Sequence, residues 1–272
     1  MYGRLSVLAA VAAAFILPAA PSSAAESVLD QVKQRGELRI AGVLYRPLIA
    51  PRPNGEYVGI DVEVLKRMAA DLGVKANFVQ GEFATAVAGI AAGKWDIVPA
   101  ICITDARRQV IDFSETYITI GATFVSLTNN SKNLTTVEAF NRPEVVFAVP
   151  SGSWSEAVVM EAAPKATRKS FGQTTSSDLV QEVVAGRADA VVLDTPIQIT
   201  LARAAFPDKL RIVPGAEQPL EVKACKVGYG YMKGDEKFGA YINAFLKKMR
   251  DSGELEKLNR QYMKPEMIKA TN

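Results

Sequence analysis

One pattern occurs twice in the chain and restricts its fold: a helix end, a glycine, a basic residue, an aspartate and then a short apolar strand. It reads AAGKWDIVPA at residues 91–100 and VAGRADAVVLD at residues 184–194. Other apolar strands also alternate with amphipathic helical segments, and such crossovers join parallel strands. The pattern predicts an α/β fold of two similar lobes, each with a mostly parallel sheet flanked by helices. Coincidence is the alternative, because helix-Gly-strand junctions are common.

Composition limits the chemistry that this fold can perform. The 272 residues are 49% hydrophobic and 22% charged with a net charge of +3, which is globular and gives no reason to expect a nucleic-acid partner. Histidine is absent. This excludes Ser-His and Cys-His nucleophile pairs and any His-ligated metal. We expect no metal and no cofactor, and the composition favours binding over catalysis.

The N-terminus has the pattern of an export signal. Arg4 precedes the apolar run from Leu5 to Leu17, and Pro18 and a series of small residues follow. A membrane anchor would need about 20 apolar residues, and this run ends at a proline after 13. We expect residues 1–25 to be a signal peptide cleaved before Glu26, and the mature protein to be soluble in the periplasm.

The two cysteines, Cys102 and Cys225, have two interpretations. In an oxidising compartment an even pair can form a disulfide. The alternative is two buried, unpaired thiols that act as small hydrophobic side chains.

Two helix starts are candidate anion sites. Thr104 is a good N-cap, and Arg107 falls at the third helical position, where its guanidinium suits a carboxylate. Ser153 starts another helix after a strand end and a glycine, so free N–H groups and a hydroxyl could hold an anion. The alternative for each is an ordinary capped helix. One site falls in each predicted lobe.

Three further residues lie near strand ends, where open α/β sheets bind ligands. Asp194 follows the strand predicted at residues 188–193, and its carboxylate suits an ammonium group. Tyr45 follows the first strand, and Phe83 starts a helix. Their rings could stack on a ligand or attract a cation. For Phe83, core packing is the alternative.

These residues resemble the solute-binding proteins of family 3, the polar amino-acid class that serves ATP-driven importers. The resemblance is carried, in order, by GEYVGIDVEVLKRMAADLGV (55–74), AAGKWDIVPAICITDARRQVIDFSETY (91–117), VPSGSWSE (149–156), AGRADAVVLD (185–194) and VGYGYMKGDEKF (227–238). It implies a two-lobed fold with the ligand between the lobes and two crossover strands at the hinge. The implied lobe 1 is 26–117 with 220–272, and the implied lobe 2 is 118–219.

The resemblance also implies a ligand site, made of Tyr45, Phe83, Ala100, Cys102, Arg107, Ser153 and Asp194. In this comparison Arg107 and Ser153 hold the α-carboxylate of the ligand, and Asp194 receives its α-ammonium group. Tyr45 and Phe83 enclose its side chain. Ala100 offers a backbone carbonyl.

Three positions depart from the family pattern. Cys102 stands where a Ser or Thr usually bonds the ligand, and a thiol is a poor donor. Gly42 stands where binders of basic amino acids often carry an acid, which argues against Lys or Arg as the ligand. Arg46 could face an acidic ligand side chain or solvent. The resemblance also brings residues 220–230 near the strand end that carries Cys102, which favours the disulfide.

The implied function is capture of an amino acid or related small carboxylate by a monomer that is not an enzyme. Binding closes the lobes, with hinges near 115–121 and 215–222, and the ligand passes to the membrane permease of an ABC importer. An exported dehydratase acting on prephenate or arogenate is the alternative. It would need a carboxylic acid such as Asp194 or Glu156. A sensory or partner-binding ectodomain is a third hypothesis, and it would normally need a tether.

Overall fold

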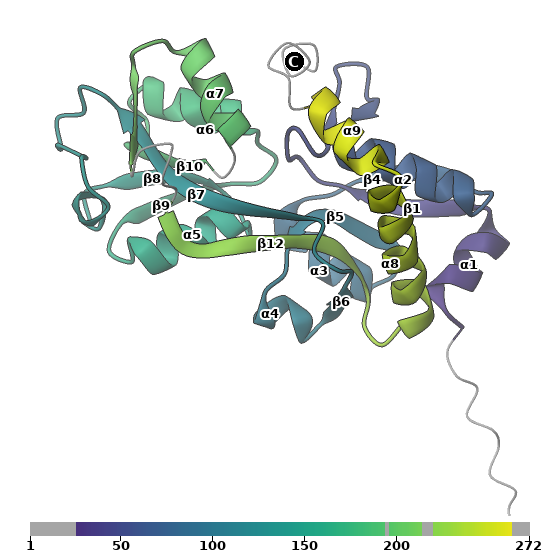
Figure 1. The fold of residues 1–272 in the computed structure, drawn as a ribbon. Coiled ribbons are helices and arrows are strands. Elements are labelled where there is room, and N and C mark those ends of the chain that lie inside the picture. Colours follow the sequence, from purple (N-terminus) through teal and green to yellow (C-terminus); the bar gives the residue numbers. More distant parts are fainter. Residues whose placement is uncertain (1–25, 194–195, 214–219, 263–272) are drawn as a thin grey trace, which may run out of the picture.

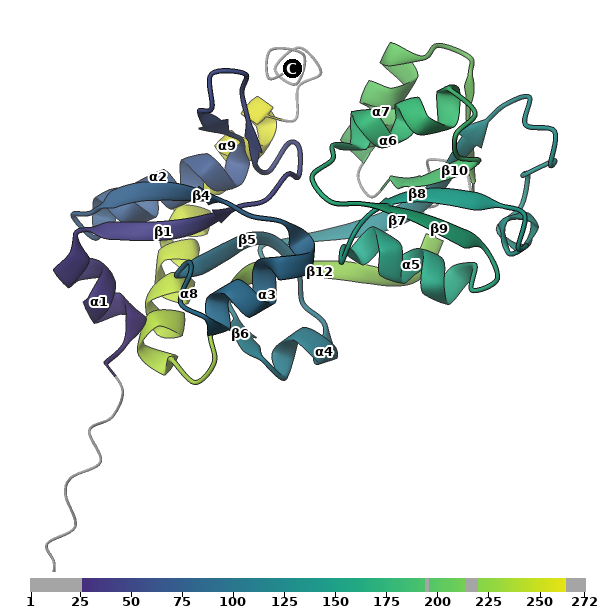
Figure 2. The ribbon, with the colours of Figure 1, turned by 180° about the vertical axis from the view of Figure 1, so that it is seen from behind.

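Two lobes joined by a pair of long strands make up the molecule (Figures 1 and 2). This computed structural model describes residues 26–193, 196–213 and 220–262. The predicted signal peptide, Asp194 and most of the second predicted hinge lie outside the described residues. Within the described ranges, no helix has both the length and the apolar character to cross a membrane.

The first lobe is built from the two ends of the described chain. Its first part comprises α1 (Val28–Arg35), β1 (Glu37–Gly42), β2 (Ala50–Pro51), β3 (Tyr57–Val58), α2 (Ile60–Asp71), β4 (Lys75–Gln80), α3 (Phe83–Ala91), β5 (Ile97–Cys102), α4 (Asp105–Arg108) and β6 (Ile111–Phe113). The returning chain adds α8 (Glu236–Asp251) and α9 (Glu254–Tyr262).

The second lobe lies between the two crossover strands, β7 (Ile118–Leu127) and β12 (Leu220–Met232). Its elements are the 3-10 helix η1 (Glu138–Phe140), β8 (Val146–Pro150), α5 (Trp154–Ala162), β9 (Thr167–Phe171), α6 (Ser176–Val184), β10 (Ala190–Leu193), α7 (Pro196–Ala205) and β11 (Leu210–Val213). Separate apolar clusters fill the lobes, around Leu65 in the first and around Phe147 and Val180 in the second.

The strand order confirms the predicted fold class. It runs β4-β1-β5-β12-β7-β10-β8-β9, with β6 beside β12 and β11 beside β7. In lobe 1, β1 is parallel to β4 and β5, and in lobe 2, β8 is parallel to β9 and β10. The crossovers β7 and β12 are antiparallel to each other and to the strands that flank them. Each lobe is therefore a mostly parallel sheet closed by antiparallel strands.

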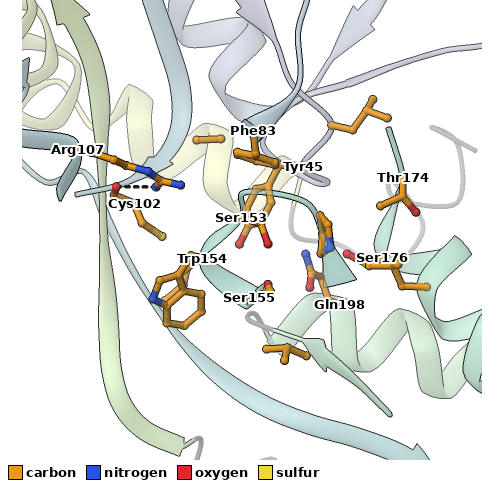
Figure 3. Close-up of a pocket in the computed structure, with 16 residues that line it drawn as sticks. Tyr45, Phe83, Cys102, Arg107, Ser153, Trp154, Ser155, Thr174, Ser176 and Gln198 are labelled. Atoms are coloured by element: carbon orange, nitrogen blue, oxygen red, sulfur yellow. Dashed lines mark hydrogen bonds between the residues drawn. The ribbon is translucent and has the colours of Figure 1, made fainter. Parts of the chain in front are cut away.

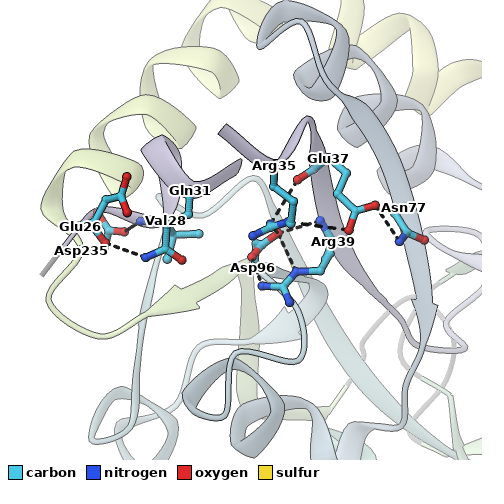
Figure 4. Close-up of polar contacts among 9 residues, drawn as sticks. All are labelled: Glu26, Val28, Gln31, Arg35, Glu37, Arg39, Asn77, Asp96 and Asp235. Atoms are coloured by element: carbon cyan, nitrogen blue, oxygen red, sulfur yellow. Dashed lines mark hydrogen bonds and ion pairs between the residues drawn. The ribbon is translucent and has the colours of Figure 1, made fainter. Parts of the chain in front are cut away.

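The repeated aspartate makes the same contacts in both lobes. Asp96 accepts a hydrogen bond from the N–H of Arg39 at 2.8 Å, and its own N–H donates to the Arg39 carbonyl at 2.8 Å (Figure 4). Asp189 makes the matching pair of bonds with Val146, also at 2.8 Å. The glycine before each has a positive φ, +65° at Gly93 and +69° at Gly186. The sequence repeat is therefore a repeated junction between a helix and a parallel strand.

The strand after the first junction begins later than its apolar pattern predicts. The pattern places it at residues 95–100, and the structure places it at Ile97–Cys102. Trp95 turns under α3 instead, where its indole N–H donates to the Ala86 carbonyl at 2.9 Å. Burial of this large side chain outweighs its preference for a strand, and the shift carries Cys102 into the strand.

Cys102 and Cys225 form a disulfide that joins β5 to the returning crossover β12. Their Cα atoms are 5.5 Å apart, within the range that a disulfide requires, and 123 positions separate them in sequence. The cross-link therefore ties the chain leaving lobe 1 to the chain that comes back into it.

Replacing both cysteines by alanine should lower the free energy of unfolding by about 4 kcal/mol, because the disulfide closes a long loop in the unfolded chain. Urea unfolding of the oxidised protein and of the double variant measures the difference. Wild type unfolded in the presence of a reductant is the control and should match the variant. Equal midpoints for oxidised wild type and the variant would contradict the expectation.

Candidate functional site

A cavity lies between the lobes, and six of the seven predicted site residues line it (Figure 3). Lobe 1 and the start of the crossover contribute Leu44, Tyr45, Phe83, Ala100, Cys102, Arg107 and Ile120. Lobe 2 contributes Pro150, Ser153, Trp154, Ser155, Thr174, Ser176, Leu179, Val192 and Gln198. The empty space measures about 540 Å³, part of it open to solvent. The seventh predicted residue, Asp194, lies outside the described residues.

Arg107 is positioned by the helix start that the sequence predicts. Thr104 caps α4, its hydroxyl accepting from the Arg107 N–H at 3.3 Å. The guanidinium donates to the carbonyl of Cys102 at 2.8 Å and, across the cavity, to that of Gly152 at 3.0 Å. Burial lowers its pKa to about 10, so the group remains charged at neutral pH. Among the described residues lining the cavity, it carries the only charge.

Ser153 faces Arg107 from the other lobe, at the N-terminus of α5. Its hydroxyl oxygen accepts from the Glu156 N–H at 3.1 Å, which leaves the hydroxyl proton available to a ligand. The N-terminus of a helix also favours negative charge. A cation from lobe 1 and a helix start from lobe 2 therefore point into one cavity, an arrangement that suits a carboxylate.

Ala100 enters the cavity through an irregularity of β5. Val98 pairs with Gly230 and Ile101 with Gly228, so two residues of β5 stand opposite one residue of β12. This is a β-bulge. Ala100 has a φ of +54°, a conformation that costs energy for a residue with a side chain and that is common at binding sites.

Two aromatic side chains form the upper wall in Figure 3. The rings of Tyr45 and Phe83 meet edge to face, with centroids 6.2 Å apart and planes at 88°. Trp154 lies across the cavity from them, on α5. The structure brings the predicted aromatic pair together at the cavity, and its contact with a ligand remains a prediction.

Cys102 lines the cavity but has no thiol to offer, since its sulfur is in the disulfide. Its main-chain carbonyl instead holds Arg107. One half of the disulfide therefore lies at the edge of the site, next to Arg107.

Besides lining one cavity, described residues of the two lobes form hydrogen bonds with each other. The amide of Gln80 donates to Gln173 at 2.8 Å, Arg107 donates to the Gly152 carbonyl, and Gln198 donates to the Arg46 carbonyl at 3.3 Å. Gly152 also packs against Ala84 so closely that a Cβ on Gly152 would lie 2.6 Å from the Ala84 Cα. The structure is therefore a closed arrangement of the lobes.

Sequence reasoning missed several of the lining residues, among them the aromatic or polar Trp154, Ser155, Thr174, Ser176 and Gln198. The polar run QTTSS at residues 173–177, just before α6, was the available signal for two of them, because polar side chains at helix starts often contact ligands. No local signal identified Gln198, which lies inside α7.

Glu156 and Arg46, both raised by the sequence analysis, do not line this cavity. Glu156 is engaged elsewhere, accepting from the Gly152 N–H at 2.8 Å and from the Ser170 hydroxyl. Arg46 lines a neighbouring cavity together with residues of α6, among them Asp178. Burial lowers the Arg46 pKa, and the negative charge of Asp178 opposes this shift.

A buried carboxyl lies behind Ala100, at the start of the crossover. Asp61 accepts hydrogen bonds from the hydroxyls of Tyr117 at 2.7 Å and Tyr229 at 3.0 Å, and the two rings stack with centroids 4.7 Å apart. Burial raises the Asp61 pKa to about 7, although the tyrosine hydroxyls and the Ala100 N–H favour the ionised form. Asp61 thus joins α2 to both strands that leave and re-enter the lobe.

Asp61→Asn should make stability less dependent on pH. The wild-type carboxyl has a pKa of about 7 in the folded state against 3.8 as its ordinary value. The folded state therefore binds the proton more tightly, and its stability falls as pH rises through this window. Relative to the variant, wild type should lose roughly 3 kcal/mol between pH 4 and pH 7. Urea unfolding of both proteins at these pH values measures it, and parallel pH profiles would refute it.

The fold and the site define a class: a two-lobed protein that encloses a small solute in a charged cleft. Residues 38–265 match the bacterial extracellular solute-binding proteins, family 3. The chain belongs to this family.

Relatives of two kinds are similar over most of the chain. The cyclohexadienyl dehydratase of Pseudomonas aeruginosa is 27% identical over 248 residues, 90% of each chain. The ABC transporter glutamine-binding protein GlnH of Bacillus subtilis is 27% identical over 215 residues, 78% of this chain and 74% of that one. Among solved structures, the ancestral amino acid-binding protein AncCDT-1, a precursor of cyclohexadienyl dehydratase, superposes with a TM-score of 0.76 at 33% identity. That match covers 88% of this chain and all of the other.

Proposed function

We propose that this protein captures an amino acid between its lobes outside the cytoplasm, in the periplasm, and delivers it to the membrane permease of an ABC importer. Family membership, the glutamine-binding relative and the ancestral amino acid-binding protein support this function. The protein acts by binding and release and is not an enzyme.

The observation that carries the proposal is the environment of the Arg107 guanidinium. Its charge is partly buried in the cleft between two main-chain carbonyls, and no described acidic side chain lines the same cavity. A buried guanidinium is stabilised by a bidentate carboxylate, and every amino acid carries one. Ser153 and the start of α5 face the same point from lobe 2.

The proposed closure of the two lobes on the ligand follows from the positions of Arg107 and Ser153. Arg107 belongs to lobe 1 and Ser153 to lobe 2, so one carboxylate can contact both only when the lobes are together. Closure removes water from the cleft and strengthens the charged contacts. The ligand shifts the population of open and closed forms by its higher affinity for the closed form. Asp194 would receive the α-ammonium group.

Arg107→Ala should weaken amino-acid binding by roughly 30-fold to several-thousand-fold, since a buried carboxylate would lose its partner. Arg107→Lys should bind weakly too, because an ammonium group cannot form the two parallel bonds. A thermal-shift screen of the twenty amino acids identifies the ligand, and calorimetry measures the affinities.

The control is Arg108→Ala, which removes the neighbouring exposed arginine outside the cavity and should leave affinity unchanged. Binding by Arg107→Ala within threefold of wild type would refute the assignment of Arg107. Absence of any amino-acid ligand for wild type would refute the function.

Gly152→Ala should hinder closure, because the added Cβ would meet the Ala84 backbone in the closed arrangement. Its affinity should fall at least tenfold, and its ligand-bound radius of gyration should exceed that of wild type. Gly186→Ala is the matched control: its φ of +69° equals the +68° of Gly152 within a degree, and nothing lies within 4 Å of its added Cβ. The two variants should be equally destabilised, and equal affinities would contradict the expected clash.

A dehydratase is the second candidate, favoured by the Pseudomonas relative that matches 90% of both chains. That chemistry needs a carboxylic acid in the cleft. Glu156 is bonded outside the cavity, so Asp194 is the remaining candidate from the sequence. Incubating the purified protein with prephenate and following phenylpyruvate by absorbance tests it. Turnover that Asp194→Asn abolishes would favour the enzyme over the binding protein.

A further inference from the structure

The end of the cavity away from Arg107 is polar and uncharged. Thr174, Ser176 and Gln198 lie there, on the opposite side of Ser153 from the guanidinium (Figure 3). Thr174 and Gln198 are 8% and 5% exposed, so both are enclosed rather than part of a solvated rim. Hydroxyl and amide groups at this depth can donate to a ligand and accept from it, but they cannot neutralise a charge.

Apolar side chains also line the cavity. Ile120 and Val192 come from the neighbouring strands β7 and β10, Leu179 from α6 and Trp154 from α5. These side chains can cover the methylene groups of a ligand that reaches from Arg107 to the polar end. The cavity therefore combines one cation, several apolar side chains and a neutral hydrogen-bonding end.

A basic ligand side chain would find no counter-charge along this path. None of the described lining residues is acidic, and Asp194, where the resemblance places the α-ammonium contact, is already assigned. Asp178 does lie in the adjoining cavity, but Arg46 lies there with it. A desolvated, unpaired ammonium or guanidinium is strongly disfavoured.

The sequence analysis associated an acidic side chain at position 42 with basic ligands. The structure leaves no room for a side chain at Gly42. A Cβ there would lie 2.3 Å from the Tyr57 hydroxyl, which donates to the Gly42 carbonyl at 3.2 Å. Tyr57 stacks on Phe78, with ring centroids 5.3 Å apart, and is held in place. The tyrosine thus occupies the space that a side chain at this position would need.

We infer that the ligand is an amino acid whose side chain is uncharged and ends in an amide or hydroxyl group. The inference rests on the proposed function, because Arg107 must hold the α-carboxylate for the side chain to extend toward Gln198. Glutamate is disfavoured for the same reason as lysine: the one charged group lining the described cavity already has a carboxylate partner.

Calorimetry on protein unfolded and refolded to remove bound ligand tests the inference. The probes are glutamine, asparagine, threonine and serine, compared with lysine, arginine and glutamate and with leucine and methionine. At least one of the first four should bind 100-fold or more tightly than any charged amino acid, and at least tenfold more tightly than the two apolar ones. Glutamine and glutamate have the same shape, so their comparison isolates charge.

The outcomes separate the two proposals. Binding of no amino acid overturns the proposed function and the inference with it. Binding of lysine, arginine or glutamate within tenfold of the best uncharged ligand overturns the inference alone, as does tighter binding of leucine or methionine.

A variant that gains affinity for lysine would show where the end of the ligand side chain lies. Ser176→Asp places a carboxylate at the first residue of α6, where negative charge is tolerated, and should raise lysine affinity at least tenfold. Ser176→Asn has the same shape without the charge and should leave lysine affinity unchanged. If lysine gains nothing in a Ser176→Asp variant that melts as wild type does, the polar end does not contact the ligand side chain and the inference is wrong.

Discussion

The contacts of the partly buried Arg107 guanidinium are the interactions on which the rest of the site depends. The guanidinium donates to one carbonyl from each lobe, those of Cys102 and Gly152. The first carbonyl is fixed by a strand end and a disulfide, the second by a glycine packed against the opposite lobe. A charge removed from water needs such partners, and two neutral carbonyls leave its charge uncompensated. The geometry therefore favours a carboxylate and a closed cleft together.

The junction between a helix and a parallel strand that occurs once in each lobe helps to position the site. Asp96 and Asp189 each pair with the backbone of a neighbouring parallel strand, so the sheet of each lobe is assembled in the same way. Parallel strands end at one edge of a sheet, and the two edges face each other across the cleft. The helix starts that follow, α4 in lobe 1 and α5 in lobe 2, then supply a cation and a hydroxyl to one cavity.

Both crossover segments are anchored to lobe 1 at one place. Asp61 bonds Tyr117 just before β7 and Tyr229 within β12, so one buried carboxyl holds both strands against lobe 1. Cys225 ties β12 to β5 nearby. In the proposed closing movement, these anchors would place the hinge beyond them, in the strands themselves. Ala100 packs at the same place, so the proposed ligand site lies next to these anchors.

The sequence by itself determined the fold class, the helix starts that carry Arg107 and Ser153, and the aromatic residues at the strand ends, because caps, glycine stops and apolar periodicity are local signals. It could not distinguish a bonded from an unbonded pair of cysteines without the resemblance to a family. Only the tertiary structure decided that Gln198 and Trp154 line the cleft, that Glu156 does not, and that Tyr57 fills the space above Gly42. These outcomes depend on which distant segments meet, and packing between lobes leaves no periodic trace in the chain.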